Sequence, residues 1–441
     1  MLHIDMDVHA LFRGKKITML GLGLLGRGVG DAAFLAECGA ELIVSDKKSA
    51  HELAPSVEKL KRFPNIIFHL GEQPIQDFQN RDLIVKAAGV PKDSPHIAAA
   101  REAGIPVVMS TALFAAHARK MGATLIGVTG TRGKSTVAHM IYHALARKDA
   151  EKTHLGGNVR GLSTLSMLPS IHEGDTVVFE LDSWQLQGFG DLGISPDTAV
   201  FTNLMPDHMN YYEGSMEKYF EDKANIFRFQ KAGERIIVGH SVEHLVAAAH
   251  PDATIVVPES IPEEWKLVVL GEHNRENAAL ARAALEPYLS DKDIRDGLET
   301  FQPVEGRLQF VREVSGVKIY NDCNATTPEA TIAALKTLGV GKNIVLIAGG
   351  SDKHLDLTQL RIEIERSCKR VLLLEGEGTN RLLESGLQAE QFPTLALALD
   401  AAIRAATSGD VILLSPGFAS YGMFLNEYDR NDQFLALVRA L

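Results

Sequence analysis

The sequence predicts an α/β protein with three domains, each built around a parallel sheet that carries helices on both faces. Apolar runs of four to six residues alternate with longer segments of helical period, a pattern typical of buried parallel strands. Glycine-rich segments follow three of these runs, at residues 21–28, 127–136 and 348–353. Open α/β sheets bind ligands at such positions, so each segment indicates a separate ligand-binding sheet.

The expected strands are short runs rich in apolar residues. They cover residues 16–20, 41–45, 123–127, 175–179, 198–202, 343–347, 370–374 and 410–414. No Pro-rich or Ser-rich linker separates them, so the domain boundaries follow from the strands and the glycine-rich segments alone. We expect domains at 1–112, 113–303 and 304–441. The length of 441 residues fits this division, because domains usually contain about 100–200 residues.

Composition excludes several classes of protein. Hydrophobic residues make up 45% of the chain and charged residues 23%, which is ordinary for a globular protein and argues against disorder. The formal net charge is −11, whereas proteins that bind long nucleic acids usually present a basic face. Cys38, Cys323 and Cys368 lie far apart and form no CxxC pair, as expected in a reducing compartment.

Membrane signals are missing from the sequence. No run approaches the roughly 18 apolar residues that a membrane helix needs. The first 13 residues contain Asp5 and Asp7 and lack the apolar core of a signal peptide. We therefore expect a cytoplasmic protein with no membrane partner.

Residues 21–26 read GLGLLG and directly follow the first expected strand, and Asp46 ends the next one. Together they match the dinucleotide-binding fingerprint. In it, glycines let the backbone approach a pyrophosphate, and the acid binds a ribose hydroxyl. The fingerprint does not say which diphosphate binds, so an NAD-dependent dehydrogenase is one alternative from this motif. A tight strand–helix turn without a ligand is another.

Residues 129–136 read TGTRGKST between an expected strand and an expected helix. Gly130 and Gly133 free the backbone, so its N–H groups can surround phosphate. Lys134 is expected at the β- and γ-phosphates of a nucleotide, and the Ser135 hydroxyl at Mg²⁺. Val128 stands where the usual P-loop has glycine, so the motif is a variant. A γ-phosphate site argues against a dehydrogenase, which has no use for one.

The helix expected after this motif has one apolar face. That face comprises Val137, Ala138, Met140, Ile141, Ala144 and Leu145.

Three further residues lie near strand ends or helices of the central domain. Glu180 lies just beyond an expected strand, where P-loop proteins carry a metal-binding acid, although a solvated strand end is the alternative. His208 follows the neighbouring strand, and an isolated histidine is more often structural than a ligand. Lys223 lies on a helix expected to begin near Ser215, whose other face is apolar. Taken alone, Lys223 would be an exposed lysine.

The order of these motifs resembles the Mur ligase family, the ATP-dependent amide ligases of peptidoglycan precursor synthesis. The family's central domain reads T-G-T-x-G-K-[ST]-T, G-N, E-x-S-[SW]-[FW]-Q-L, N-[LV]-x-x-D-H and K-x-x-I-[FY], followed by H-N-x-x-N. The matching segments of this chain are 129–136, 157–158, 180–186, 203–210, 223–227 and 273–277, and an Arg opens the third domain. The resemblance implies a Rossmann-like N-terminal domain, a central P-loop ATPase-like domain and a Rossmann-like C-terminal domain.

The resemblance also implies roles for matched residues. The catalytic residues would be Lys134, Glu180, His208 and Lys223. The ATP site would comprise Gly130, Thr131, Gly133, Lys134, Ser135, Thr136, Asn277, Arg307 and Asp322. Two Mg²⁺ ions would be held by Ser135, Glu180, His208 and a carbamylated Lys223. A UDP-sugar would contact Gly21, Gly23, Leu24, Leu25, Gly26, Asp46, Lys47, Gly89 and Asn158. The amino acid would contact Thr326, Lys353, Ser420, Tyr421 and Tyr428.

Within the family, the GLGLLG start and residues 414–434 look most like the ligases that add D-glutamate to UDP-N-acetylmuramoyl-L-alanine. Three positions depart from that pattern. Asn324 replaces a customary lysine, residues 87–89 read AAG in place of SPG, and residues 110–112 lack a common acid. None of these lies in the ATP motifs.

The implied reaction uses ATP to convert the substrate carboxylate into an acyl phosphate, which the amine of D-glutamate attacks. The alternatives are a related ligase for L-glutamate or another amino acid, the dehydrogenase, and an inactive binding protein with this fold. The retained Lys134, Glu180, His208 and Lys223 argue against the inactive protein. We expect a monomer that binds no nucleic acid.

Overall fold

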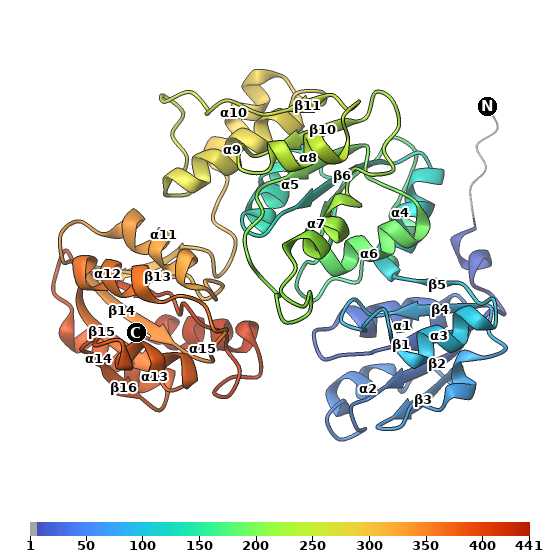
Figure 1. Ribbon diagram of the computed structural model, residues 1–441, viewed down its shortest axis with the longest axis horizontal. Helices are drawn as coiled ribbons and strands as arrows, with labels where there is room; N and C mark the ends of the chain where they lie inside the picture. The colour runs from blue at the N-terminus through green and yellow to red at the C-terminus, as the bar shows by residue number, and fades with distance from the viewer. Residues whose placement is uncertain (1–6) are drawn as a thin grey trace. The chain divides into compact units, whose positions relative to one another are not determined.

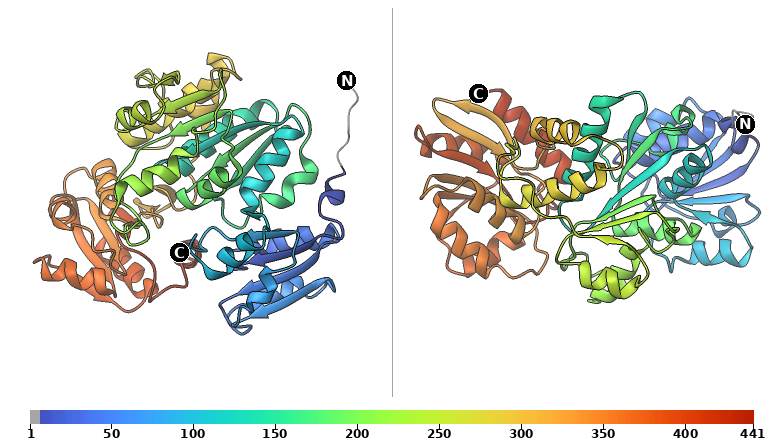
Figure 2. Two further views of the ribbon diagram at one scale, coloured as in Figure 1. Left: turned by 45° about the vertical axis from the view of Figure 1, so that its right-hand side comes forward. Right: turned by 90° about the horizontal axis from the view of Figure 1, so that it is seen from above.

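The structure is a computed structural model that describes residues 7–441 (Figure 1). The first domain is predicted to start at residue 1, so its first six residues lie outside the described ones. The chain divides into two compact units. One runs to Ile261 and includes Asn277–Leu298, and the other comprises Pro262–Glu276 and Glu299–Leu441. The described residues form three separate sheets, two in the first unit and one in the second (Figures 1 and 2). The domain boundaries proposed from sequence stay predictions.

The first sheet is parallel, with the strand order β3-β2-β1-β4-β5. Its strands are β1 (Lys16–Leu20), β2 (Glu41–Asp46), β3 (Ile66–Leu70), β4 (Leu83–Lys86) and β5 (Val107–Val108). Its helices are η1 (Val8–Leu11), α1 (Arg27–Glu37), α2 (Ala54–Leu60), η2 (Ile75–Phe78) and α3 (Pro95–Glu102). The strand order reverses between β1 and β4, which makes their carboxyl ends the expected ligand position.

The second sheet is also parallel, in the order β11-β10-β9-β6-β8-β7. Its strands are β6 (Thr124–Thr129), β7 (Thr153–Gly157), β8 (Thr176–Glu180), β9 (Thr198–Phe201), β10 (Arg235–Val238) and β11 (Ile255–Val256). The helices from here to the third sheet are α4 (Ser110–Lys120), α5 (Lys134–Lys148), η3 (Leu165–Ser170), α6 (Ser183–Leu192), α7 (Met216–Ala224), α8 (Glu243–Ala249), α9 (Glu272–Leu285) and α10 (Asp291–Thr300). Because β6 pairs with both β8 and β9, the loops after these three strands begin side by side.

The third sheet has the order β12-β13-β17-β14-β15-β16. Its strands are β12 (Gln309–Val314), β13 (Val317–Asn321), β14 (Ile344–Gly349), β15 (Cys368–Leu374), β16 (Glu390–Phe392) and β17 (Val411–Leu414). Its helices are α11 (Pro328–Leu338), α12 (Thr358–Ser367), α13 (Glu377–Glu384), α14 (Leu395–Ala405) and α15 (Glu427–Arg439). Alternate residues of β14 enter two cores: Leu346 packs with residues of α11 and α12, and Val345 with residues of α14 and α15. Such coverage of both faces explains why the strand reads as a continuous apolar run.

The predicted fold class is confirmed, and every predicted strand is present with its ends shifted by at most two residues. The six apolar residues predicted for one face of α5 are all buried. One pairing departs from the expectation of parallel sheets, because β12 and β13 form an antiparallel hairpin. Ser315 and Gly316 in its turn have φ values of 50° and 79°, and a tight turn of this kind returns the chain antiparallel.

The sequence analysis missed strands that carry little apolar signal. β5 and β11 have two residues each, and β12 reads QFVREV at the edge of its sheet. Edge strands need to bury less surface, so their sequences vary more. Among residues 7–441, no helix combines the length and apolar character required to cross a bilayer.

Arg430 on α15 is fully buried and holds two loops of the third sheet together. Its guanidinium donates to the carbonyl oxygens of Cys323, at 3.0 Å, and Phe418, at 3.4 Å. These carbonyls lie on the segments that also carry Thr326 and Ser420, two predicted amino-acid contacts. The arginine therefore joins the loop after β13 to the loop after β17.

We expect Arg430→Met to lower the free energy of unfolding by about 2–4 kcal/mol, because buried carbonyls would lose their donors. Denaturant unfolding followed by circular dichroism measures this change. Arg404→Met is the matched control, since Arg404 is exposed on α14 and pairs only at the surface with Asp400. The control should change stability by less than about 0.5 kcal/mol. Equal stability of the two variants would contradict the role of Arg430.

Candidate functional site

The segment 130–133 leaves β6 as a loop and leads directly into α5. Gly130 and Gly133 have φ values of 140° and 82°. A Cβ at Gly130 would lie 1.9 Å from Thr202 Oγ1, and one at Gly133 would lie 2.4 Å from Asn277 Oδ1. Both positions therefore require glycine. The first N–H groups of α5 point into the space that this loop surrounds, as an anion site requires.

The segment after β9 holds this loop in place. The backbone N–H of Thr131 donates to Asn203 O at 2.9 Å, and that of Arg132 donates to Asn203 Oδ1 at 2.9 Å. The Thr131 hydroxyl also exchanges hydrogen bonds with the backbone of Met205. Arg132 pairs with Asp207 at 3.1 Å. The sequence analysis missed Asn203 and Arg132 as supports of the loop, although both lie inside the motifs it identified.

The predicted ATP residues of the first unit gather at this loop. Lys134 begins α5, and its Nζ donates to Thr131 O at 3.0 Å. Ser135 is buried and Thr136 half-buried in the same helical turn. Asn277 on α9 lies against Gly133. The roles of these residues in binding ATP stay predictions, but the structure brings all of them to one place.

Glu180 and Asn158 meet at the carboxyl ends of β8 and β7. Glu180 is the last residue of β8 and is buried. Its carbonyl accepts a hydrogen bond from the N–H of Asn158 at 2.7 Å. The side chain of Asn158 accepts from Arg27 of α1 at 2.6 Å. Asn158 therefore links the metal-binding candidate Glu180 to the first sheet's glycine-rich helix start.

His208 lies after β9 with a left-handed backbone, at φ 55°. Its ring packs on Trp184 with the centroids 4.7 Å apart, and its side chain is 41% exposed. Trp184 in turn packs on Tyr211. The partly exposed ring leaves His208 able to take a ligand, which stays a prediction.

Lys223 differs from the exposed lysine that its sequence position suggests. It is 1% exposed, and its Nζ donates to Gly130 O at 2.8 Å. The ring of Tyr219 lies 4.7 Å from the same nitrogen. Burial lowers the pKa of Lys223 well below its usual value, and the nearby charge of Lys134 lowers it further. Tertiary packing of α7 against the P-loop buries this side chain, which helical periodicity does not reveal.

Metal binding by these residues requires more than their acids and histidines. Among the described residues, no group of three or more His, Cys, Asp and Glu side chains could hold a metal ion. The lowered pKa of Lys223 favours the neutral amine, the form that reacts with CO₂ to give a carbamate. A carbamate would add the oxygen ligands that Mg²⁺ prefers, beside the cations Lys134 and Arg132. The residues present therefore fit Mg²⁺ with a carbamylated Lys223.

The glycine-rich segment of the first sheet leaves β1 at the switch point. Asp46 Oδ2 accepts from the N–H groups of Leu22, at 2.8 Å, and Gly23, at 3.2 Å. Its other oxygen accepts from Lys48 N at 2.9 Å. The carboxylate thus holds the shape of the loop, a role that the fingerprint did not predict. Binding of a uridine group by Asp46 stays a prediction.

The other predicted UDP-sugar residues of the first sheet lie at the same edge. The side chains of Leu24 and Leu25 are 44% and 39% exposed, unusual values for leucine beside a sheet. Lys47 and Gly89 are also exposed. This edge therefore presents apolar and basic groups together, which suits a nucleotide with a charged diphosphate.

The predicted amino-acid residues lie on three adjacent loops of the third sheet, after β13, β14 and β17. Lys353 Nζ lies 3.4 Å from Thr326 Oγ1. Ser351 and Ala419 form an isolated antiparallel bridge, which brings the loop that carries Ser420 beside the loop that carries Lys353. Tyr421 and Tyr428 lie on the same stretch, the former 67% exposed. These residues share one region, and their contacts with an amino acid stay predictions.

Asp322 ends β13 in a buried position. Its carboxylate accepts from Ser415 Oγ at 2.8 Å and from Leu308 N at 3.0 Å. Burial raises the pKa of Asp322 to about 7, although the Ser415 and Leu308 hydrogen bonds and the charge of Arg307 oppose the shift. Asn324, which replaces the family's lysine, donates to Glu305 O at 3.2 Å.

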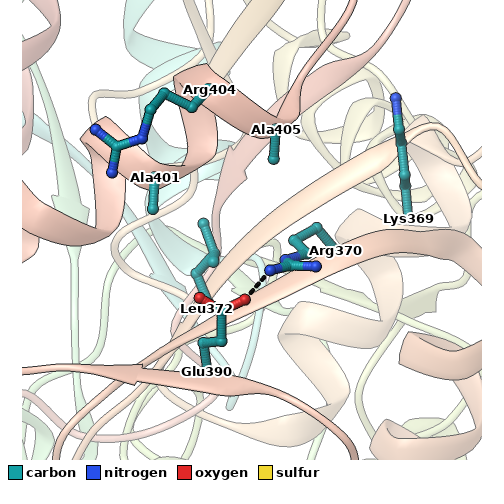
Figure 3. Close-up of a pocket in the computed structure, with 7 residues that line it drawn as sticks. All are labelled: Lys369, Arg370, Leu372, Glu390, Ala401, Arg404 and Ala405. Carbon is teal, nitrogen blue, oxygen red and sulfur yellow. Dashed lines mark hydrogen bonds and ion pairs between the residues drawn. The ribbon is translucent and has the colours of Figure 1, made fainter.

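A pocket of about 460 Å³ lies at the opposite edge of the third sheet. Figure 3 shows Arg370 paired with Glu390 there, beside Lys369 and Arg404. Lys369 pairs with Asp410, and Arg404 with Asp400. Since each of these cations has a carboxylate partner and the pocket lies at the amino end of β15, it does not belong to the ligand edge.

Family models match three parts of the chain. Residues 15–109 match the Mur ligase MurD-like, N-terminal domain, and residues 128–258 match the Mur ligase middle domain. Residues 306–418 match the Mur ligase, glutamate ligase domain. Together these matches cover most of the chain in the order found in the family.

Curated relatives match nearly the full length. A UDP-N-acetylmuramoylalanine–D-glutamate ligase of Roseiflexus sp. is 35% identical, over 97% of this chain and 99% of the relative. Enzymes of the same name from Borreliella afzelii and Acetivibrio thermocellus are 32% and 30% identical. The first alignment covers 97% of this chain and 98% of the relative, and the second 99% and 98%.

Solved structures share the fold at low sequence identity. The UDP-N-acetylmuramate-alanine ligase of Thermotoga maritima has a TM-score of 0.62 at 19% identity, over 97% of this chain and 99% of its own. A MurF ligase of Thermotoga maritima, solved with ADP, has a TM-score of 0.59 at 15% identity, over 98% and 96%. Given three matching domains and relatives above 30% identity over the whole length, the chain belongs to the Mur ligase family.

Proposed function

We propose that the chain is an ATP-dependent ligase that joins D-glutamate to the alanine carboxylate of UDP-N-acetylmuramoyl-L-alanine, a step in making peptidoglycan precursors. The observation that carries this proposal is the meeting of Lys134, Glu180 and Lys223 around one anion-binding loop. Full-length similarity to enzymes named for this activity supports the choice of substrates. We further propose that the enzyme acts in the cytoplasm as a monomer.

A carboxylate cannot form an amide directly, because its oxygen is a poor leaving group. In the first step, an oxygen of the alanine carboxylate attacks the γ-phosphorus of ATP, and the bond to ADP breaks. Phosphoryl transfer of this kind depends on positioning and charge neutralisation. The loop N–H groups and Lys134 supply both for the phosphates. In the second step, the glutamate nitrogen attacks the carbonyl carbon, phosphate leaves, and the nitrogen loses a proton.

Mg²⁺, when bound, would neutralise charge on the γ-phosphate. We propose that Ser135 and Glu180 hold one ion, and that Glu180, His208 and the carbamate on Lys223 hold a second. The buried Lys223 amine suits this role because its pKa is lowered and because its nitrogen touches the loop that surrounds the phosphates. An unmodified ammonium could not ligate a cation.

The two other substrates belong to the outer sheets. The first sheet's edge, with its glycine-rich loop and Lys47, would bind the UDP group. The third sheet would bind glutamate through Lys353 and the hydroxyls of Thr326 and Ser420. Because both glutamate carboxylates are charged near pH 7, cationic and hydroxyl donors suit this ligand.

A ligase for L-glutamate or another amino acid is the alternative nearest in chemistry. An NAD-dependent dehydrogenase is the alternative of another class, and the γ-phosphate loop disfavours it. Ligand-dependent heat stability distinguishes these: UDP should stabilise the protein, whereas NAD should not.

The direct test measures phosphate release from ATP in the presence of Mg²⁺, UDP-N-acetylmuramoyl-L-alanine and a panel of amino acids. We expect D-glutamate to support release at least ten times faster than L-glutamate or either alanine enantiomer. Preference for L-glutamate would establish the related ligase instead. Release that depends on no amino acid would remove the proposal.

A site variant separates amino-acid binding from ATP binding in this assay. We expect Lys353→Ala to raise the KM for D-glutamate far more than the KM for ATP. Lys342→Ala is the control, because Lys342 is an exposed lysine at the opposite edge of the same sheet.

Lys134→Ala should lower turnover by roughly 10³-fold or more, because it removes the charge directed at the β- and γ-phosphates. Steady-state phosphate release measures the effect. Lys148→Ala, at the far end of the same helix, should leave turnover unchanged. Near-normal turnover of Lys134→Ala would exclude ATP chemistry at this loop.

Lys223→Ala should be almost inactive, and a small carboxylic acid such as acetate should restore part of the activity by occupying the place of the carbamate. Intact mass measured under CO₂-saturated conditions should show one added CO₂ in the parent protein and none in the variant. Lys218→Ala, on the exposed face of the same helix, is the control. An active parent protein with an unmodified Lys223 would contradict the carbamate.

A further inference from the structure

The loop between β4 and α3 of the first sheet is tied to α7 of the second sheet by an ion pair. Lys92 Nζ lies 2.8 Å from Asp222 Oδ1. The lysine side chain is 45% exposed, whereas the aspartate side chain is 12% exposed. The carboxylate is therefore part of the packed interior, and the lysine reaches it from the surface.

Two buried donors fix the orientation of Asp222. Its second oxygen accepts from Gln187 Nε2 at 2.7 Å and from the Tyr212 hydroxyl at 3.1 Å. Burial raises the pKa of Tyr212, so the phenol stays protonated and able to donate. Gln187 also donates to the hydroxyl of Tyr211. With donors from α6, from the segment before α7 and from the first sheet, the carboxylate has little freedom to rotate.

Asp222 immediately precedes Lys223 on α7, so the two side chains move with one stretch of backbone. On one side, Asp222 is held by Lys92. On the other, Lys223 Nζ donates to Gly130 O in the phosphate loop. The ring of Tyr219 lies under Lys223 and packs 5.0 Å from Tyr212. A shift of α7 would therefore disturb the ion pair and the lysine together.

At its other end, the ion pair holds the loop 87–94, which leaves β4 at the switch point of the first sheet and contains Gly89. Lys86 Nζ donates to Val90 O at 3.3 Å within this loop. These contacts order a loop that starts beside the glycine-rich segment after β1, since β1 and β4 are neighbours.

We propose that Lys92 and Asp222 are positioning residues that hold the 87–94 loop ready for the nucleotide sugar and link its binding to the placement of Lys223. This inference rests on the proposed function, because it takes the first sheet's edge as the UDP-sugar site. Ordering the loop before binding removes an entropic cost that the ligand would otherwise bear. Neither residue is expected to touch the reacting atoms.

A second ion pair between the same sheets provides a matched control. Arg101 on α3 lies 3.8 Å from Asp191 on α6. It also joins the first sheet's helices to those of the second, but it contacts neither the 87–94 loop nor α7. Arg101→Met therefore removes an ion pair across the same boundary without breaking the proposed link.

The experiment measures the Kd for UDP-N-acetylmuramoyl-L-alanine by calorimetry without ATP or Mg²⁺, together with the KM values for this substrate and ATP. We expect Lys92→Met and Asp222→Asn each to weaken nucleotide-sugar binding about tenfold. The double variant should be no weaker than the weaker single variant, within twofold. Lys92→Arg and Arg101→Met should stay within twofold of the parent, and the KM for ATP should not change.

Parent-like binding by Lys92→Met would overturn the proposal, as would an equal loss in Arg101→Met or multiplied losses in the double variant. If Asp222→Asn does not fold, Lys92→Met and Lys92→Arg decide the question, since Lys92 is largely at the surface. Failure of the proposed function looks different: the parent protein itself would not bind the nucleotide sugar.

Discussion

The hydrogen bonds between the phosphate loop and the segment after β9 constrain the rest of the central site. Asn203 takes the N–H groups of Thr131 and Arg132 with its carbonyl and its side-chain oxygen. This leaves the following N–H groups, at the start of α5, to face an anion. It also fixes Gly130 O, the acceptor for Lys223. A parallel sheet makes the arrangement possible, because β6 and β9 are hydrogen-bonded neighbours whose loops must emerge together.

Burial of Lys223 follows from the same constraint and has an electrostatic consequence. The phosphate loop already carries Lys134 and Arg132, so a third buried cation would be costly. The pKa of Lys223 falls in response, chiefly through loss of solvent. A neutral amine in this place is chemically available for CO₂, and the resulting anion would relieve the excess of positive charge. Structure and chemistry thus point in the same direction at this residue.

The candidate ligand edges of all three sheets obey one rule, in that loops at the carboxyl ends of adjacent parallel strands carry the polar residues. The supports of these loops differ. Asp46 holds the first by accepting backbone N–H groups, Asn203 holds the second, and Arg430 holds the third by donating to carbonyls. Each support satisfies loop backbone groups that secondary structure leaves unpaired, which keeps a ligand loop ordered without extending the sheet.

The sequence by itself determined the α/β class, the long strands and the glycine loops, because buried parallel strands need unbroken apolar runs and close phosphate contacts need glycine. It also identified Lys134, Glu180 and His208 through their spacing in motifs. Only the tertiary structure decided that Lys223 is buried, that Asp46 closes its own loop, and that Lys92 reaches Asp222 from a segment 130 residues away. Periodicity reports which face of one helix is apolar, whereas burial of a charge and pairing between distant segments depend on what packs against that face.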